Sequence, residues 1–262
     1  MDFELRFLLK FSRRLPAMRG SGKVAGVLTS FYNRKHRPEV QAEVFGAQMR
    51  LTPGEALDGQ LLFCPQMYER LEMGLLRGFL RPGHVFLDAG SNIGFYSLTA
   101  SQFVGPTGRV LAIEADRTNF ARLSNNLKLN NSVNVTAKNV GLSDRAEVLR
   151  LGLNLSGNSG GHSFLATGDG GEMVTCKPLI DLLNEAGIKR IDAAKFDIEG
   201  FEFKVLDAFF RAKPPQALIP HFIIIEQNHL LREKAGDALA LLRREGFTVR
   251  KIKDQNHLAV RD

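Results

Sequence analysis

Short apolar runs alternate with segments of helical periodicity from residue 85 to residue 260, and no other feature restricts the fold as strongly. The apolar runs predict strands at 85–89, 109–115, 134–140, 193–198 and 221–227. Between and after them, helices are expected at 95–103, 117–130, 178–186, 201–210 and 229–244. Strands that alternate with helices form a mostly parallel sheet covered on both faces. The sequence therefore predicts a doubly wound α/β fold.

The last two strand-like segments, 247–253 and 256–260, are separated only by Asp254-Gln255. Two strands joined by so short a turn form a hairpin, which adds one antiparallel strand and predicts a seven-stranded sheet. Residues 145–177 interrupt the alternation with strand-like pieces around a glycine-rich loop. Thr118 is the expected cap of the helix at 117–130.

The residues before 83 lack this alternation. Residues 40–63 suggest short strands around a turn at Pro53-Gly54, and residues 66–80 have helical periodicity. Residues 1–37 predict one or two helices, broken by Pro16 and by the stretch 20–26. We expect three parts: a basic amphipathic arm at 1–37, an extension at 38–82 that packs on the core, and the sheet domain at 83–262.

The net charge of +7 belongs to the arm, because residues 1–37 hold nine Lys or Arg against Asp2 and Glu4. Apolar and basic side chains interleave there at helical spacing. They are Phe3, Phe7, Leu8 and Phe11, with Arg6, Lys10, Arg13 and Arg14. Charges interrupt every apolar run, which argues against a signal peptide and against a membrane span of ~20 residues. The pattern favours a helix packed on its own domain; peripheral contact with an anionic membrane is the next interpretation, and nucleic acid the last.

Cys64 and Cys176 are the only cysteines and lie far apart in the sequence. They form no CxxC or Cys/His cluster, so neither a disulfide framework nor a zinc site is expected. The sequence predicts two reduced thiols in a cytoplasmic protein.

The run 85–94, VFLDAGSNIG, delivers Asp88 at a strand end and then turns through Gly90, Ser91, Asn92 and Gly94 into a helix. Gly90 lets the backbone pass close to a ligand, and Gly94 allows a tight start to the helix. A dinucleotide fingerprint would have glycine where Asp88 stands. A carboxylate there repels a pyrophosphate but attracts the ammonium of a methionyl group. We therefore expect this turn to bind a sulfonium nucleoside.

Glu114 closes the next strand, about 20 residues after the turn. An acidic residue at this spacing accepts both ribose hydroxyl hydrogen bonds in nucleoside-binding sheets. Asn139 and Gly141 stand at the end of the strand at 134–140, where an adenine would lie. An ordinary β-turn explains these two residues nearly as well.

A third cluster of ionisable side chains closes the strand at 193–198. Strand alternation sends Lys195, Asp197 and Glu199 to one side, where three such groups are costly to bury without purpose. Asp197 is expected to contact the cofactor, steer the acceptor or act as base; a salt-bridged strand end is the alternative. Glu226 and His162 are further candidates to receive a proton, and His229 is a weaker one.

These motifs make the chain resemble the FkbM family of methyltransferases. The matching pieces are Met67-Tyr68-Glu69, RPGHVFLDAGSNIGFYSL, IEA, NVGLSD, GNSGGHSFL, PLIDLLNEAGIKRIDAAKFDIEGFE and IIIEQN, within residues 40–260. The resemblance implies a class I, Rossmann-like methyltransferase domain at 83–262 that binds S-adenosyl-L-methionine. It maps the cofactor turn onto Asp88, Gly90, Asn92 and Gly94, the ribose acid onto Glu114, and the second motif onto Lys195, Asp197, Glu199 and Gly200. The basic arm lies outside the shared pattern.

The resemblance further implies O-methylation of a hydroxyl in a sugar, glycolipid, polysaccharide or polyketide-type product. Candidate catalytic residues are Asp197, Glu199, Glu226 and His162. A divalent metal held by Asp197 and Glu226 ranks below a metal-free base, and no metal is expected. Nucleic acid is disfavoured because Asp197-Ile198-Glu199-Gly200 lacks the Pro-Pro-aromatic element of base methyltransferases. Two rival functions are an NAD-dependent oxidoreductase and a non-catalytic, membrane-peripheral nucleoside-binding protein.

Overall fold

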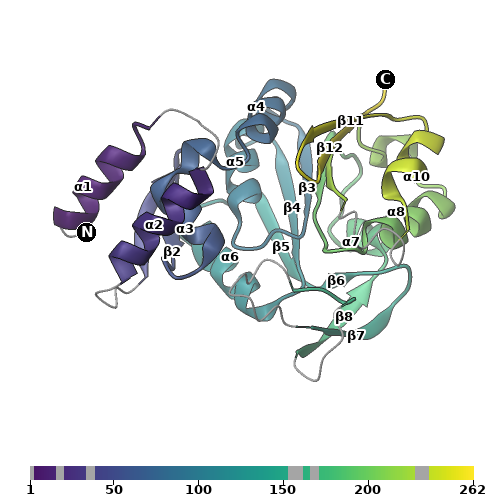
Figure 1. Ribbon diagram of the computed structural model, residues 1–262. Coiled ribbons are helices and arrows are strands. Elements are labelled where there is room, and N and C mark those ends of the chain that lie inside the picture. Colours follow the sequence, from purple (N-terminus) through teal and green to yellow (C-terminus); the bar gives the residue numbers. More distant parts are fainter. Residues whose placement is uncertain (1–2, 16–20, 34–38, 153–161, 166–170, 228–235) are drawn as a thin grey trace.

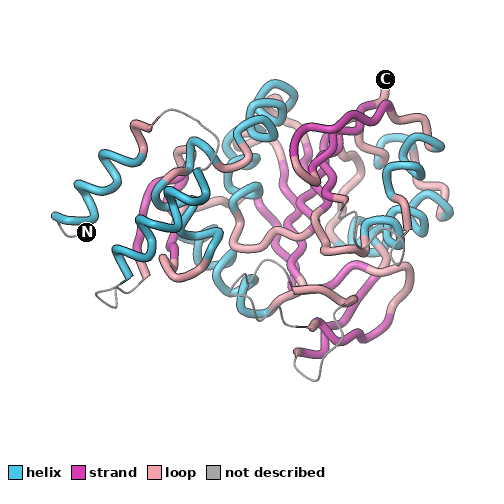
Figure 2. Tube along the Cα trace, in the orientation of Figure 1, coloured by secondary structure: helices cyan, strands magenta, loops and turns pink. Residues whose placement is uncertain are grey.

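The computed structural model describes residues 3–15, 21–33, 39–152, 162–165, 171–227 and 236–262 (Figure 1). At its centre is a seven-stranded sheet with the strand order β11-β12-β10-β9-β3-β4-β5. The strands are β3 (Val85–Ala89), β4 (Arg109–Glu114), β5 (Val135–Asn139), β9 (Ala193–Phe196), β10 (Phe222–Glu226), β11 (Thr248–Lys253) and β12 (Asn256–Val260). Figure 2 shows helices on both sides of this sheet. The predicted doubly wound fold is confirmed.

Neighbouring strands of the large sheet run parallel except at β12, which is antiparallel to both β10 and β11. The predicted closing hairpin is therefore confirmed. The chain passes from β3 outward to β5 and then returns to β9 on the other side of β3. The carboxyl ends of β3 and β9 thus flank the switch in strand order, where sheets of this kind bind ligands.

Helices pack two hydrophobic cores against the two faces of the sheet. One face carries α4 (Arg70–Phe79), α5 (Phe95–Val104) and α6 (Arg117–Leu129); the other carries α7 (Leu179–Glu185), α8 (Glu202–Arg211), η3 (Gln216–Leu218) and α10 (Ala238–Arg244). Phe86 belongs to the first core and Leu87 to the second, because successive residues of a strand point to opposite faces. The predicted helix at 229–244 is described only from residue 236, so its first part lies outside the described residues.

The expected strand pair around Pro53-Gly54 is wrong. The hairpin of β1 (Val40–Val44) and β2 (Ala47–Leu51) turns at Phe45-Gly46, where both residues have the positive φ that a two-residue hairpin turn requires. The next apolar run forms helix α3 (Ala56–Phe63), followed by the short η1 (Pro65–Met67). Leu61–Phe63 are buried in succession, and such a run does not distinguish a strand from a buried helix.

The arm forms helices α1 (Phe3–Ser12) and α2 (Ser21–Asn33), which both pack on α3. A break through residues 20–26 is wrong for α2, which continues through Gly26; Pro16 lies outside the described residues. Helix α1 buries Leu5 and Leu9, whereas the predicted apolar side chains Phe7 and Phe11 are exposed. Leu5 and Leu9 are also one helical turn apart, so periodicity alone permits either face. The side chain of Phe3 lies outside the described part.

A smaller sheet lies beside the large one and consists of β6 (Gly141–Leu142), β8 (Glu172–Lys177) and β7 (Glu147–Leu151). It confirms the strand-like pieces expected within 145–177. The expected cap Thr118 is wrong: Asp116 accepts a hydrogen bond from the Asn119 amide at 2.7 Å and so caps α6.

Candidate active site

The turn between β3 and α5 folds back over the ends of the neighbouring strands. The amides of Gly90 and Ser91 both donate to the Ile113 carbonyl oxygen, each at 3.0 Å. Gly90 has a φ of 84°, and a Cβ atom there would lie 1.8 Å from the carbonyl oxygen of Asp197. Gly94 has a φ of 96°, and its Cβ would lie 2.7 Å from a leucine of α6. Both turn positions therefore require glycine.

Asp88 is fully buried at the end of β3. One carboxylate oxygen accepts from the Ser97 hydroxyl at 2.5 Å, and Oδ1 has no hydrogen-bond partner among the described residues. Burial raises the pKa of Asp88, and the Lys195 ammonium partly offsets this rise. The unpartnered oxygen leaves an acceptor for a donor that the described side chains do not supply.

Glu114 ends β4 and holds the turn from the other side. Its two oxygens accept from the amides of Asn92 at 2.7 Å and Asp116 at 2.8 Å. Burial raises the pKa of Glu114 to about 7, although both amides favour the charged form. Each carboxylate oxygen keeps a second lone pair, so Glu114 can still accept two hydroxyl donors. The side-chain oxygen of Asn92 is also buried without a partner among the described residues.

A cavity beside the turn encloses about 850 Å³ of empty space, part of it open to solvent. Polar groups line it from Ser91, Asn92, Glu114, Asp116, Asn119, His162, Lys195, Asp197 and Glu199. Apolar side chains line the remainder, among them Leu57, Ile113, Val140, Leu142, Leu151 and Phe164. The cavity thus combines an apolar slot with hydrogen-bonding groups at its rim.

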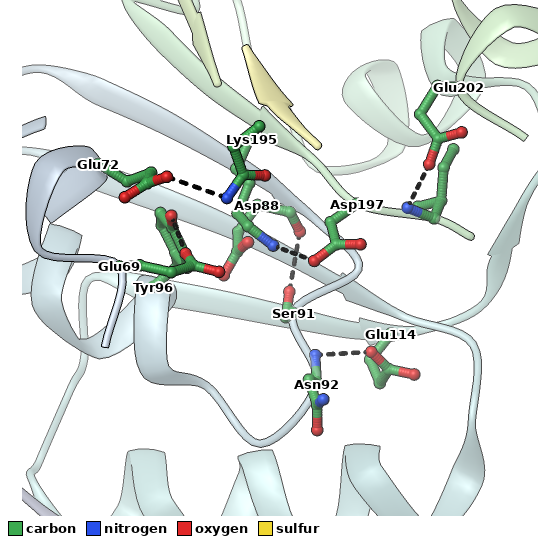
Figure 3. Close-up of polar contacts among 12 residues, drawn as sticks. Glu69, Glu72, Asp88, Ser91, Asn92, Tyr96, Glu114, Lys195, Asp197 and Glu202 are labelled. Atoms are coloured by element: carbon green, nitrogen blue, oxygen red, sulfur yellow. Dashed lines mark hydrogen bonds and ion pairs between the residues drawn. The ribbon is translucent and has the colours of Figure 1, made fainter. Parts of the chain in front are cut away.

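Lys195 is the cationic centre of the site and is 6% exposed. Its ammonium lies 2.6 Å from a carboxylate oxygen of Asp197 and 4.6 Å from the centre of the Tyr96 ring (Figure 3). Burial opposes its charge, but the carboxylates of Asp197, Glu69 and Asp88 outweigh burial and raise the pKa of Lys195. Burial alone would raise the pKa of Asp197, yet the Lys195 ammonium lowers it. The pair is therefore charged at neutral pH.

Glu69 joins this cluster from the segment before the sheet domain. Its carboxylate accepts a hydrogen bond from the Tyr96 hydroxyl, and burial raises its pKa. The backbone of Glu69 is left-handed, with a φ of 42°. A non-glycine residue in this conformation costs about 1–2 kcal/mol and occurs often at functional sites. In the sequence, Tyr68 and Glu69 stand out only as part of a matching piece. No pattern there indicates a role in the site for either residue or for Tyr96.

Glu199 and Glu226 hold protons more tightly than ordinary carboxyl groups. Burial, followed by the charge of Asp197, raises the pKa of Glu199 to about 8. The charge of Asp197 and then burial raise the pKa of Glu226, whose side chain shares a hydrogen bond with Asp197. Glu202 accepts from the amides of Ile198 and Gly200, at 2.8 and 3.0 Å, and so braces the turn that presents Glu199. The ionised carboxylate of Asp197 and the more readily protonated carboxyl groups of Glu199 and Glu226 therefore interact with one another.

The structure brings most of the predicted site residues to the cavity, but not all. Gly90, Ser91, Asn92, Glu114, Gly141, His162, Asp197 and Glu199 line it. Asp88, Gly94 and Glu226 are not among the residues that line it. Asn139 is exposed, and its side-chain amide donates to the carbonyls of Glu114 and Ala115, so it does not line the cavity. His162 pairs with Asp116 at 3.0 Å, and His229 lies outside the described residues.

Among the described residues, no group of three or more His, Cys, Asp or Glu side chains is arranged to hold a metal ion. Within the same ranges, no helix is both long and apolar enough to cross a bilayer. Cys64 and Cys176 are both buried and free.

One family model matches more than half of this chain. The family model described as the methyltransferase FkbM domain matches residues 88–249. The methyltransferase sdnD of Sordaria araneosa is 34% identical over 157 residues, covering 48% of this chain and 60% of that protein. The chain thus spans about three fifths of the length of this curated relative.

Solved structures of low sequence identity are also similar. The methyltransferase FkbM of Methylobacillus flagellatus KT is 17% identical with a TM-score of 0.46, covering 92% of this chain and 60% of that chain. A methyltransferase of Geobacter sulfurreducens is 17% identical with a TM-score of 0.46, covering 100% of this chain and 96% of that chain.

Proposed function

We propose that this chain, which belongs to the FkbM methyltransferase family, transfers the methyl group of S-adenosylmethionine to a hydroxyl group. The acceptor class we propose is a sugar, glycolipid, polysaccharide or polyketide-type product. The two free, buried cysteines are in keeping with the reducing cytoplasm, where we place the reaction.

The observation that carries this proposal is the pairing of Glu114 with the turn at Gly90. The Glu114 carboxylate borders an apolar slot and keeps acceptor capacity for the two hydroxyls of a ribose. Asn92 lines the cavity and offers a buried oxygen without a partner among the described residues. Asp88 has another such oxygen at the end of β3, although Asp88 itself does not line the cavity. These residues fit a nucleoside with a cationic amino-acid end. A pyrophosphate would be repelled by Asp88, which disfavours NAD.

In the proposed mechanism the bound cofactor supplies a methyl group on a sulfonium that is already a good leaving group. The chain must then orient the acceptor and remove its proton. Asp197 is held as an anion by Lys195, which makes it a weak base and a suitable orienting group. Glu199 lines the cavity and has a pKa of about 8, so we propose that it is the base that accepts the proton of the acceptor hydroxyl. Glu226 and His162 are the alternative acceptors of that proton.

Replacing Glu114 with glutamine is expected to weaken S-adenosylmethionine binding by roughly 10- to 100-fold, because a charge-assisted hydrogen bond to the ribose is lost. Isothermal titration measures this change, and thermal unfolding checks the fold. Glu172→Gln is the matched control, since Glu172 also accepts a backbone amide, that of Arg117 at 2.8 Å, but does not line the cavity. Heat of binding with NADH and none with S-adenosylmethionine would reject the cofactor assignment.

A methyl-transfer assay against a panel of hydroxyl acceptors tests the reaction itself. Affinity for the cofactor without transfer to any member would favour the non-catalytic alternative. Transfer that retains its rate in Glu114→Gln would contradict the proposed site.

The rate of methyl transfer is expected to rise with pH and to level off above about 8. Glu199 accepts a proton only when it is ionised, and burial raises its pKa to about 8. Glu199→Gln should lower kcat/KM by roughly 10²- to 10⁴-fold and flatten this pH profile. Glu226→Gln is the companion variant, and it should keep the inflection. If Glu226→Gln removes the inflection of the pH profile and Glu199→Gln does not, the base is Glu226.

A further inference from the structure

Helix α1 is fastened to the body of the protein along one face. Leu5 and Leu9 are buried in the same core as α3. The Arg13 guanidinium donates to the carbonyl oxygen of Leu62 at 3.0 and 3.2 Å and to that of Glu43 at 2.8 Å. These contacts fix which side of the helix faces outward.

The outward side combines aromatic and basic side chains. We call it the α1 outer face, and it consists of the exposed residues Arg6, Phe7, Lys10, Phe11 and Arg14. The spacing of one, three and four residues places the first four on one stripe of α1, and Arg14 follows in the turn after the helix ends at Ser12. Phe7 is 65% and Phe11 is 60% exposed, so both rings lie largely in solvent. Exposed rings bordered by cations are the composition of helices that lie in a membrane interface.

Helix α2, which also packs on α3, adds exposed apolar surface. Val27 and Phe31 are 69% and 48% exposed, and α2 packs on α3 as α1 does. Figure 1 places α1 and α2 together at one end of the molecule, far from α10 and the C-terminus. The two helices therefore lie in one region of the molecule.

Charge decides which partner suits this face. Glu4 is the only acidic residue between positions 3 and 33. A second copy of the chain would bring cations against cations, and a nucleic acid would leave the two phenylalanine rings without an apolar partner. An anionic lipid surface accommodates both, because headgroups attract the cations and the acyl boundary accepts the rings.

We propose that the α1 outer face docks on an anionic membrane surface. Phe7 and Phe11 enter the interface while Arg6, Lys10 and Arg14 lie among the headgroups. Docking rests on α1 alone, so it holds whether or not the proposed methyl transfer is correct.

Sedimentation of the full chain with lipid vesicles tests this proposal. We expect binding to vesicles that contain phosphatidylserine, little binding to phosphatidylcholine alone, and a loss of binding as salt is raised. Lys10→Gln with Arg14→Gln should weaken the partition about 30-fold, at ~1 kcal/mol for each charge. Lys189→Gln with Lys251→Gln removes two exposed charges of the body and should leave binding unchanged.

The aromatic contribution has its own pair of variants. Phe7→Ser with Phe11→Ser should weaken vesicle binding roughly 100-fold at low salt, because two largely exposed rings lose their burial in the interface. Val133→Ser with Met173→Ser, at side chains 94% and 62% exposed elsewhere, should have no effect. Unfolding midpoints should stay unchanged in all four double variants.

Several results would overturn the proposal. They are absence of vesicle binding by the unmodified chain, equal binding to neutral vesicles, and binding that the α1 variants do not alter. A dimer in sedimentation velocity that Phe7→Ser and Phe11→Ser dissociate would assign the face to a second copy instead. Duplex or single-stranded nucleic acid that binds in preference to vesicles through Lys10 and Arg14 would assign it to nucleic acid.

Discussion

Replacing Gly90 with alanine is expected to abolish methyl transfer and S-adenosylmethionine binding, and to destabilise the fold by about 3 kcal/mol or more. The added Cβ would lie 1.8 Å from the Asp197 carbonyl oxygen, a distance that no rotamer change can relieve. The two backbones cannot separate cheaply, because the Asp197 amide donates to the Ala89 carbonyl at 3.0 Å. The turn must therefore open, and Asn92 loses its bond to Glu114.

The matched control is Gly187→Ala. Gly187 also has a positive φ, 63°, but no heavy atom lies within 4 Å of a Cβ built there. The substitution should cost only about 1 kcal/mol from backbone strain and should leave activity intact. Urea unfolding and calorimetric titration compare the two variants. Normal cofactor affinity in Gly90→Ala would show that the turn is not held against Asp197.

Replacing Lys195 with methionine is expected to cost about 3–5 kcal/mol of stability at pH 7, because it leaves buried carboxylates without their cation. Methyl transfer should fall at least ~100-fold, since Asp197 loses the contact that holds it in place. The deficit in stability should shrink as the pH falls. In the unmodified chain the pKa of Asp197 is lowered, so its contribution is present at neutral pH and is lost in acid. Without the ammonium this pKa rises, and the folded variant binds a proton that stabilises it as the pH falls.

Lys204→Met is the control for this variant. Lys204 also contacts two carboxylates, Asp144 and Glu147, each at 3.0 Å, and lies 4.9 Å from the centre of the Phe201 ring. Its side chain is 32% exposed, so solvent screens the pairs and their loss should cost about 1 kcal/mol or less. Unfolding curves between pH 5 and pH 8 compare the two variants. Equal losses at both lysines would mean that burial does not set the importance of Lys195.

The sheet was predictable because most of its strands have an apolar run of their own, bounded by a helix or a turn. β9 and residues 222–225 of β10 are buried on both faces, so their sequences are almost purely apolar. The same property misled the interpretation of residues 59–63, where three consecutive buried side chains belong to a helix. Which face of α1 is buried was also unpredictable, since Leu5 and Phe7 are both apolar and only packing on α3 decides between them.

Parts of the site were predictable where a local turn and a strand end place the residue. Glu114 and the turn at Gly90 are of this kind, and they meet through the Asn92 amide. Asn139 shows the limit of such reasoning, because a strand-end side chain can point along the backbone of its neighbour. Glu69 lies 19 residues before Asp88, and no local pattern indicates that its carboxylate reaches Tyr96.

Glu69 shows that the site includes residues outside the part of the chain that matches the family model. The shared family domain begins at residue 88, yet Tyr68 and Leu57 line the cavity and Glu69 faces Lys195 from outside that domain. One wall of the cavity is therefore built by residues that precede the matched range. Residues 38–82 include α4, which packs on the sheet, so grafting them between relatives would exchange this wall together with part of one hydrophobic core. A protein trimmed to residues 88–249 would lose the wall and also β12 and the first residues of β3.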